Sequence, residues 1–199
     1  MRKILQMKKN IILLFGLISF VAKAQEKVSV EEKLLGIQLG IVNTSFQYEI
    51  KLDRKITLLS EIGMTFGTSN KDYIDPNIED EKASVIAPYV TFEPRWYYGL
   101  DRREKLGKNI KHNSSNYIAL STSYVSSDTP IVHSGNFDIV SALYVIPKYG
   151  IRRVFAKHFN YEFSAGVGYQ YNVFSKSSGC NCDHNDTVID IQARIGYNF

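Results

Sequence analysis

The chain ends with IDIQARIGYNF, residues 189–199, in which apolar and polar side chains alternate without a break. A period of two over the whole segment predicts a β-strand with one apolar and one polar face. The last three residues of the apolar face are Ile195, Tyr197 and Phe199. The segment therefore indicates a sheet that has an apolar environment on one side and a polar environment on the other.

The same alternation recurs along the chain and predicts an all-β fold. Eight strands are expected, at residues 34–41, 45–52, 56–66, 85–98, 116–125, 137–153, 159–173 and 189–199. Polar, turn-rich stretches separate them, and the segment 67–84 is expected to be a long loop. Pro88 and Pro94 cannot donate ladder hydrogen bonds, and the sixth strand is expected to break near Pro147 and Gly150.

The amino-terminal segment has the three parts of a secretory signal peptide. Basic residues precede an apolar run at 11–20, and the tripeptide Ala-Lys-Ala at 22–24 matches a small-residue cleavage site. The apolar run is about half of the ~20 residues that a membrane-spanning helix requires. We therefore expect a cleaved signal peptide at residues 1–24 and a single domain at residues 25–199, with an uncleaved amphipathic helix as the alternative.

Removal of the signal changes the charge of the protein. The whole chain has 24 Lys and Arg against 20 Asp and Glu, but five bases lie in the signal, which leaves 19 and a net charge of about −1. This balance removes the main support for nucleic-acid binding. No later apolar run is long enough for a membrane helix, so a membrane location would require a closed β-barrel.

Three stretches carry a family resemblance: the final strand that ends at Phe199, EPRWYYGLDRREKLGKN at 93–109, and GIRR…KHFNYEFSAGVGY within 150–169. With them the chain resembles small outer-membrane barrels of the OmpA and OmpX type, and in style the uncharacterised outer-membrane β-barrel proteins of Bacteroidetes. The resemblance implies an eight-stranded antiparallel transmembrane β-barrel in the outer membrane of a Gram-negative bacterium. It also implies a monomer that contacts outer-membrane lipid and lipopolysaccharide. Its last apolar residues would be the signal for the barrel assembly machinery, namely Ile195, Tyr197 and Phe199.

If both termini lie in the periplasm, the connections alternate between the two sides of the membrane. Those near 43, 67–84, 126–136 and 174–187 are expected outside, and those near 54, 99–115 and 156–159 in the periplasm. The 99–115 connection is basic, can hold a short helix at 100–106, and is longer than the usual periplasmic turn. Its length leaves the strand count and the side of this connection open.

A soluble barrel of the lipocalin type is the competing fold, because it also alternates but places its apolar residues inside. Glycines decide between the two, since a narrow lumen needs small residues. They fall on the polar face, at Gly36, Gly40, Gly63, Gly166, Gly168 and Gly196. The apolar face therefore belongs outside, which favours the membrane barrel.

The polar face also carries charged residues of both signs that would point into the lumen. The candidates are the acids Glu49, Glu61, Glu93, Glu162 and Asp190 and the bases Lys51, Arg95 and Arg194, with Lys148 and Arg152 as further bases. An eight-stranded barrel is just wide enough for side chains to fill it, and an unpaired buried charge is very costly. These residues are therefore expected to form salt bridges that plug the barrel. A gated ion path or a catalytic carboxylate pair is the alternative.

The loop GCNCDHND at 179–186 is a weak metal-site candidate. Cys180, Cys182 and His184 are ligand types that zinc or copper accepts, but a structural zinc site normally uses paired CxxC spacing. A local disulfide or two free thiols are the alternatives. We expect no metal and no cofactor.

An outer loop combines His133 and Ser134 with Asp128, which are residue types of a hydrolase triad. Such a trio arises easily by chance in a polar loop, so we do not expect an enzyme.

Two connections are strongly charged. The segment 71–82 is acidic and could contact cations that bridge lipopolysaccharide, and the segment 101–111 is basic and could contact anionic headgroups or a periplasmic partner.

Three classes of function are compatible with these features. A structural or interaction protein, built as a plugged barrel at the cell envelope, agrees best with a charged and paired lumen. A small pore or a conduit for apolar solutes, as in barrels that resemble OmpW, would need an open or apolar lumen. A lipid-directed barrel enzyme is the third class.

Overall fold

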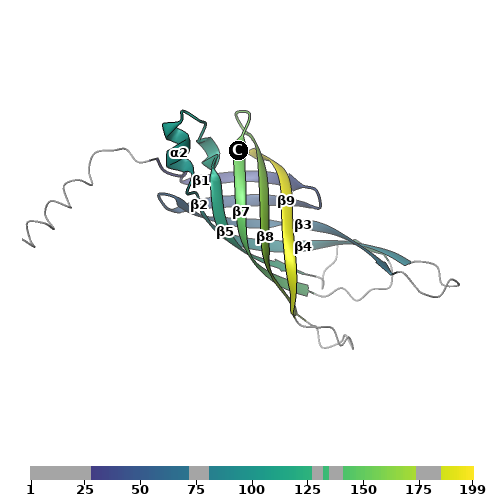
Figure 1. The fold of residues 1–199 in the computed structure, drawn as a ribbon. Helices are drawn as coiled ribbons and strands as arrows, with labels where there is room; N and C mark the ends of the chain where they lie inside the picture. Colours follow the sequence, from purple (N-terminus) through teal and green to yellow (C-terminus); the bar gives the residue numbers. More distant parts are fainter. Residues whose placement is uncertain (1–27, 72–80, 127–131, 135–140, 174–184) are drawn as a thin grey trace, which may run out of the picture.

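The computed structural model describes residues 28–71, 81–126, 132–134, 141–173 and 185–199, which form a closed β-barrel (Figure 1). The barrel strands are β1 (Lys33–Gly40), β2 (Asn43–Asp53), β3 (Ile56–Lys71), β4 (Glu81–Trp96), β5 (Asn116–Val125), β7 (Ser141–Val154), β8 (Phe159–Val173) and β9 (Asn185–Asn198). The other elements are helix α2 (Leu100–Lys105), the 3-10 turn η1 (Lys111–Asn113) and the short strand β6 (Val132–Ser134). The predicted all-β class is confirmed.

Every barrel strand pairs antiparallel with its two neighbours, and the ring runs β1-β2-β3-β4-β5-β7-β8-β9. The pairing of β1 with β9, in which Gly36 lies opposite Asn198, closes the ring. The amide of Phe199 extends this seam by donating a 2.9 Å hydrogen bond to the carbonyl oxygen of Leu35. In the described part of the chain the predicted eight-stranded antiparallel barrel is therefore confirmed, and β6 is an addition that pairs with β4.

The two ends of the barrel differ. The carboxy terminus, α2, and the turns after β2 and β7 lie at one end, which we call the near end, and the opposite end is the far end (Figure 1). The helix expected at 100–106 is present as α2, and the 99–115 connection shares the near end with the carboxy terminus. The connection is long because it folds into a separate unit of helix and turn instead of a tight hairpin.

The prediction of a loop at 67–84 is wrong at both of its ends. Residues 67–71 and 81–84 are paired, from Gly67 opposite Val85 to Lys71 opposite Glu81. The two strands continue there as a ribbon beyond the barrel wall (Figure 1). The polar side chains of these residues are typical of a loop and so gave no sign of a strand. The residues still pair, because the hydrogen bonds of the ladder come from backbone groups alone. For the same reason β9 begins before residue 189, at Asn185.

The prolines within the strands do not interrupt them. The predicted break near Pro147 and Gly150 is absent, because β7 pairs without a gap with β5 through this region. Pro147 affects only the pairing of β7 with β8, which passes from Val145 directly to Lys148. A proline has no N–H to donate, and so it removes ladder contacts toward one neighbour and keeps those toward the other.

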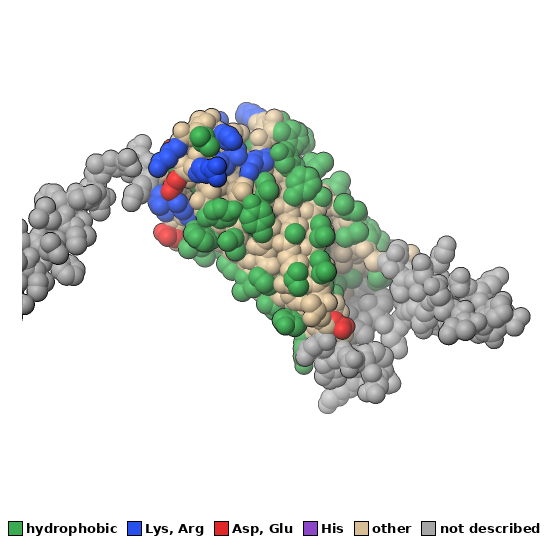
Figure 2. Space-filling view, in the orientation of Figure 1, with side chains coloured by type: hydrophobic (Ala, Val, Ile, Leu, Met, Phe, Trp, Pro, Cys, Tyr) green, Lys and Arg blue, Asp and Glu red, His purple; other side chains and the backbone are tan. Residues whose placement is uncertain are grey.

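The barrel wall is apolar outside and polar inside. In β1 the side chains of Ile37 and Leu39 are exposed, while Gln38 between them is fully buried. Figure 2 shows apolar side chains over the wall of the barrel and Lys and Arg gathered at the near end. The orientation deduced from the glycines is therefore confirmed, and the arrangement is the reverse of a soluble barrel.

Gly150 is required by the close approach of β5 to β7 inside the lumen. It lies directly opposite Tyr117, whose ring is fully buried and occupies the space that a Cβ at position 150 would need. Even an alanine would have to displace this ring.

We expect Gly150→Ala to lower the free energy of unfolding by about 1–3 kcal/mol, the usual cost of overpacking a filled interior. Urea titration of the folded barrel, followed by gel mobility, measures this change. Gly67→Ala is the matched control, because a Cβ there would approach only Val85 Cγ1, at 3.1 Å. Equal stability of the two variants would contradict the close packing of Gly150 under Tyr117.

Candidate functional site

The lumen of the barrel holds a cluster of ionised side chains from six strands, which we call the lumen ion-pair network. Its members are Glu49 on β2, Glu61 on β3, Glu93 and Arg95 on β4, Lys148 and Arg152 on β7, Glu162 on β8, and Asp190 and Arg194 on β9. All of them lie on the inward face of their strands, because side chains alternate along a strand.

Glu162 is the centre of this network. Arg95 binds its carboxylate with both Nη atoms, at 2.9 and 3.0 Å, and Arg152 Nε donates to Oε2 at 2.8 Å. Arg194 Nη2 donates to Oε1, which also accepts from Arg95 Nη2. One fully buried carboxylate therefore receives hydrogen bonds from three guanidinium groups, each of which also binds a second carboxylate.

These second contacts cross the lumen. Arg152 Nη1 on β7 lies 2.5 Å from Glu49 Oε2 on β2, and Arg194 Nη1 on β9 lies 2.8 Å from Glu61 Oε1 on β3. Neither pair joins neighbouring strands of the ring. The network therefore spans the interior from wall to wall, and charge-assisted hydrogen bonds fill the space that an open channel would need.

Arg95 is enclosed completely. Its Nε lies 2.7 Å from Glu93 Oε1, and its guanidinium carbon lies 4.3 Å from the centroid of the Tyr117 ring. The planar guanidinium combines bidentate binding of a carboxylate with packing on an aromatic face, which a lysine could not reproduce.

A near-end cap closes the lumen beside the network. It consists of the start of the described chain, α2 and η1, and its apolar interior is formed by Val28, Val30, Tyr97, Leu100, Ile110, Tyr117 and Ala119. Asn113 joins the cap to the network. Its Nδ2 donates to Glu49 Oε1 at 3.2 Å, and its Oδ1 accepts from the amide of Glu31 at 2.8 Å.

The outer surface of the cap is held to the turn between β2 and β3 by ion pairs. Asp101 on α2 lies 2.5 Å from Lys55 Nζ and 3.4 Å from Arg54 Nη1. The hydrogen bond from Lys55 lowers the pKa of the Asp101 carboxyl. These groups are partly exposed, so water screens them and they contribute far less than the buried network.

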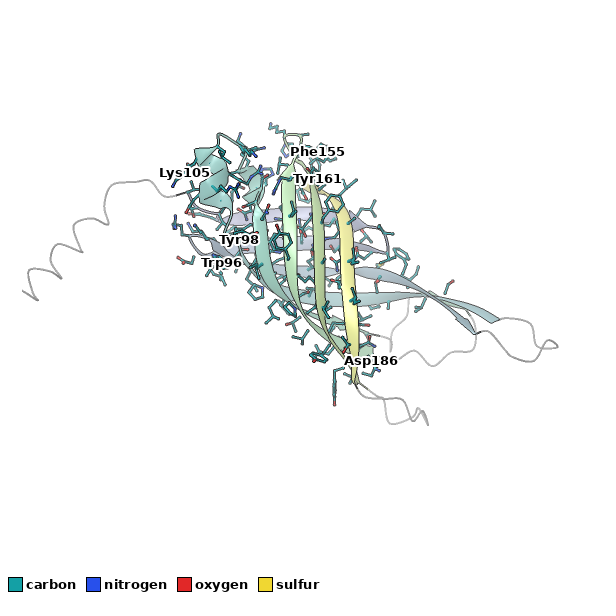
Figure 3. All side chains as sticks on the ribbon, in the orientation of Figure 1. Trp96, Tyr98, Lys105, Phe155, Tyr161 and Asp186 are labelled. Atoms are coloured by element: carbon teal, nitrogen blue, oxygen red, sulfur yellow. The ribbon has the colours of Figure 1, made fainter. Side chains whose placement is uncertain are left out.

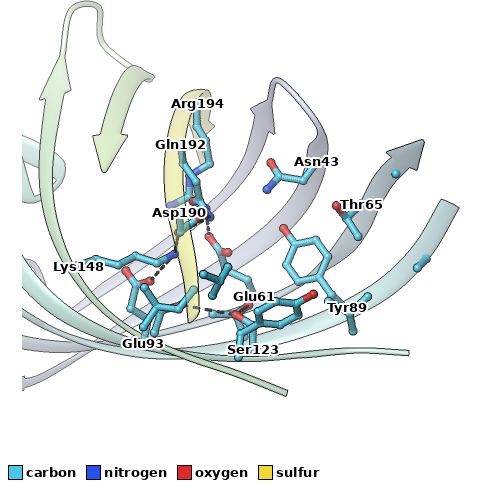
Figure 4. Close-up of a pocket in the computed structure, with 18 of the residues that line it drawn as sticks. Asn43, Glu61, Thr65, Tyr89, Glu93, Ser123, Lys148, Asp190, Gln192 and Arg194 are labelled. Carbon is cyan, nitrogen blue, oxygen red and sulfur yellow. Dashed lines mark hydrogen bonds and ion pairs between the residues drawn. The ribbon is translucent and has the colours of Figure 1, made fainter. Parts of the chain in front are cut away.

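On the other side of the network the lumen opens into a cavity of about 400 Å³ (Figure 4). Its floor consists of charged members of the network, and its walls combine hydroxyl groups with apolar side chains. The charged residues are Glu61, Glu93, Lys148, Asp190 and Arg194, and the wall residues include Thr65, Val85, Tyr89, Thr91, Ser123, Tyr144, Ile146 and Val188.

Among the residues predicted for the lumen, Lys51 is the one outside the network. Its side chain is exposed, because Lys51 lies at the end of β2, two positions before the strand ends at Asp53. Lys148 and Arg152 bind the carboxylates instead. Strand parity placed both of them inside. Sequence reasoning missed Asn113, which no strand pattern includes.

The other predicted sites have the following positions. Ile195, Tyr197 and Phe199 are exposed on the outer surface at the end of the chain. Cys180, Cys182 and His184 lie outside the described residues, as does Asp128, and His133 and Ser134 lie in β6. Among the described residues no three His, Cys, Asp or Glu side chains form a group suited to a metal ion.

The fold and the lumen together define a small closed β-barrel with an apolar exterior and an ion-paired interior. No protein-family model, no curated protein and no solved structure matches the chain. None of the described helices is long and apolar enough to cross a membrane.

We expect Glu162→Gln to lower the free energy of unfolding by about 3–5 kcal/mol, because it leaves buried guanidinium groups without their shared carboxylate. The control is Asp101→Asn, which removes a partly exposed pair and should cost at most about 1 kcal/mol. Urea titration of both variants measures the difference. A Glu162→Gln barrel as stable as the control would show that the network is not needed for folding.

Proposed function

We propose that this protein is an outer-membrane β-barrel with a plugged lumen and a structural or interaction role at the cell envelope. The observation that carries the proposal is the combination of an apolar exterior with a charged interior, which suits lipid outside and polar contacts inside. The proposal places the protein among the small outer-membrane barrels of the OmpA and OmpX type and of Bacteroidetes, which the sequence resembles.

The exterior supports a membrane location through its aromatic residues. Rings at the near end contact one another in a continuous row: Phe163, Tyr161, Phe155, Phe159, Tyr197 and Phe199. Trp96 and Tyr98 pack together at the same end (Figure 3). Tyr169 and Tyr171 are exposed toward the far end of β8, and on β8 and β9 aliphatic side chains such as Val167, Ile189 and Ile191 occupy the wall between. Two aromatic girdles that flank an aliphatic band are typical of barrels in lipid.

The proposed orientation places the near end in the periplasm. This agrees with the predicted signal peptide at residues 1–24 and with a carboxy-terminal strand that the barrel assembly machinery would recognise through Ile195, Tyr197 and Phe199. The far end would then face lipopolysaccharide and the exterior of a Gram-negative cell.

The arrangement of charges in the interior favours a plugged barrel and not a pore. Ion pairs cross the lumen between β2 and β7 and between β3 and β9, and the near-end cap covers the network on one side. A passage for ions would have to break buried charge pairs, and one for apolar solutes would need an apolar lining. We assign no enzymatic activity to the barrel.

We expect Ile191→Arg to destabilise the protein in phospholipid vesicles by about 2–4 kcal/mol, the cost of a cation near the middle of the bilayer on the lipid face. Ile191 is 78 % exposed and pairs with Ala165, midway between the two aromatic girdles. The matched control is Thr187→Arg on the same strand, which lies beside Tyr169 and should cost about 0–1 kcal/mol near the interface. Equal effects at both positions would place the exterior in water.

Conductance in planar bilayers tests the plugged lumen. We expect the inserted protein to be electrically silent, because the ion-pair network and the cap close the lumen at one level along its length. Heat-dependent gel mobility confirms that the sample is folded. Steady channels in the unaltered protein, with a conductance that changes in Arg95→Gln, would show that the protein is a pore.

A further inference from the structure

The lumen ion-pair network contains more carboxylates than cations. Within the described residues, five buried or half-buried acids face four buried bases, and no other ion pair joins them. The acids are Glu49, Glu61, Glu93, Glu162 and Asp190, and the bases are Arg95, Lys148, Arg152 and Arg194. Because an unbalanced charge inside a protein is costly, the surplus negative charge requires compensation by a proton or by a cation from solution.

The surplus lies on the side of the cavity. The two deepest carboxylates are well supplied: Glu162 has three guanidinium partners, and Glu49 binds Arg152 and also accepts from Thr57 and Asn113. Three acids but only two bases line the cavity, and one of these acids, Glu93, also binds Arg95 in the network beneath at 2.7 Å. The acids that line the cavity are Glu61, Glu93 and Asp190, and the bases are Lys148 and Arg194.

Asp190 is the most accessible of these carboxylates. Its side chain is 20 % exposed, against 4 % for Glu61 and Glu93. Its ion-pair partner, Lys148, lies 2.6 Å away and is shared with Glu93 at 3.9 Å. Gln192 Nε2 also donates to both carboxylate oxygens of Asp190, at 3.2 Å each. Asp190 is still the most exposed carboxylate of the cavity, so a cation that enters the cavity reaches it first.

The walls indicate which kind of cation fits. Tyr89, Tyr144 and Ile146 line the same hollow as Asp190, and Figure 4 shows Tyr89 across the hollow from Asp190. A volume of about 400 Å³ falls in the range of roughly 300–1,000 Å³ found for small-molecule sites. Aromatic faces attract cations, and apolar walls favour a ligand that also has an apolar part.

We propose that the cavity binds a small organic cation, with its ammonium group beside Asp190 and its apolar part against Tyr89 and Tyr144. Both the excess negative charge and the mixed walls select against anions and against neutral polar solutes. The network beneath the cavity closes the lumen, so the ligand binds and leaves through the same opening. This site does not depend on the proposed location of the barrel.

Calorimetric titration of the detergent-solubilised protein, purified from membranes of cells that express the full chain, tests the proposal. The probes are phenethylammonium, neutral 2-phenylethanol, anionic phenylacetate and tetramethylammonium. We expect phenethylammonium to bind at least tenfold more tightly than each of the others. This comparison uses the unaltered protein and so is independent of any folding defect. Equal binding of the first three probes, or none, would overturn the cation site, and equal binding of the two cations would overturn the apolar wall.

Two variants locate the ammonium group. Asp190→Asn should weaken phenethylammonium at least tenfold, and Asp190→Glu should retain binding because it keeps the charge. Asp101→Asn on the near-end cap is the matched control and should bind like the unaltered protein. Unchanged affinity in folded Asp190→Asn would show that the cation binds elsewhere.

Discussion

The width of an eight-stranded barrel is the constraint on which this structure depends. Its interior is narrow, so most of the charges that point inward must pair with one another. Glu162 meets this requirement by binding Arg95, Arg152 and Arg194 at once. Because strand alternation directs the charged side chains inward, the outer face can be almost wholly apolar.

Strand parity predicted the two faces of the barrel but not its ion pairs. Alternation around Glu162 and Arg194 is sufficient to place both inside. The partner that each one binds depends on the stagger of strands that are not neighbours, and a sequence does not contain this information. Lys51 has the right parity and yet its side chain is exposed, because it lies at the end of β2, two positions before Asp53. Strand ends were also misplaced wherever polar residues form the ladder, as at 67–71.

The near-end cap was beyond prediction for a different reason. His112 and Asn113 have positive φ angles of 48° and 57°, a conformation that is uncommon for residues other than glycine. This turn directs Asn113 toward Glu49, where it makes a hydrogen bond within the lumen. The sequence shows a long basic connection, whereas its role as a cover follows only from the three-dimensional arrangement.

The pairs that cross the lumen have a consequence for assembly. Arg152 and Glu49 are separated by 103 positions in the chain, and Arg194 and Glu61 by 133. No hairpin contains both members of either pair, so a half-built sheet would carry these charges unmatched. In a bilayer such an intermediate would expose guanidinium groups to hydrocarbon, which strand-by-strand insertion could not avoid. If the barrel is inserted into a membrane as proposed, entry into lipid and closure of the ring are expected to be one cooperative event, and contacts of such long range make that event slow.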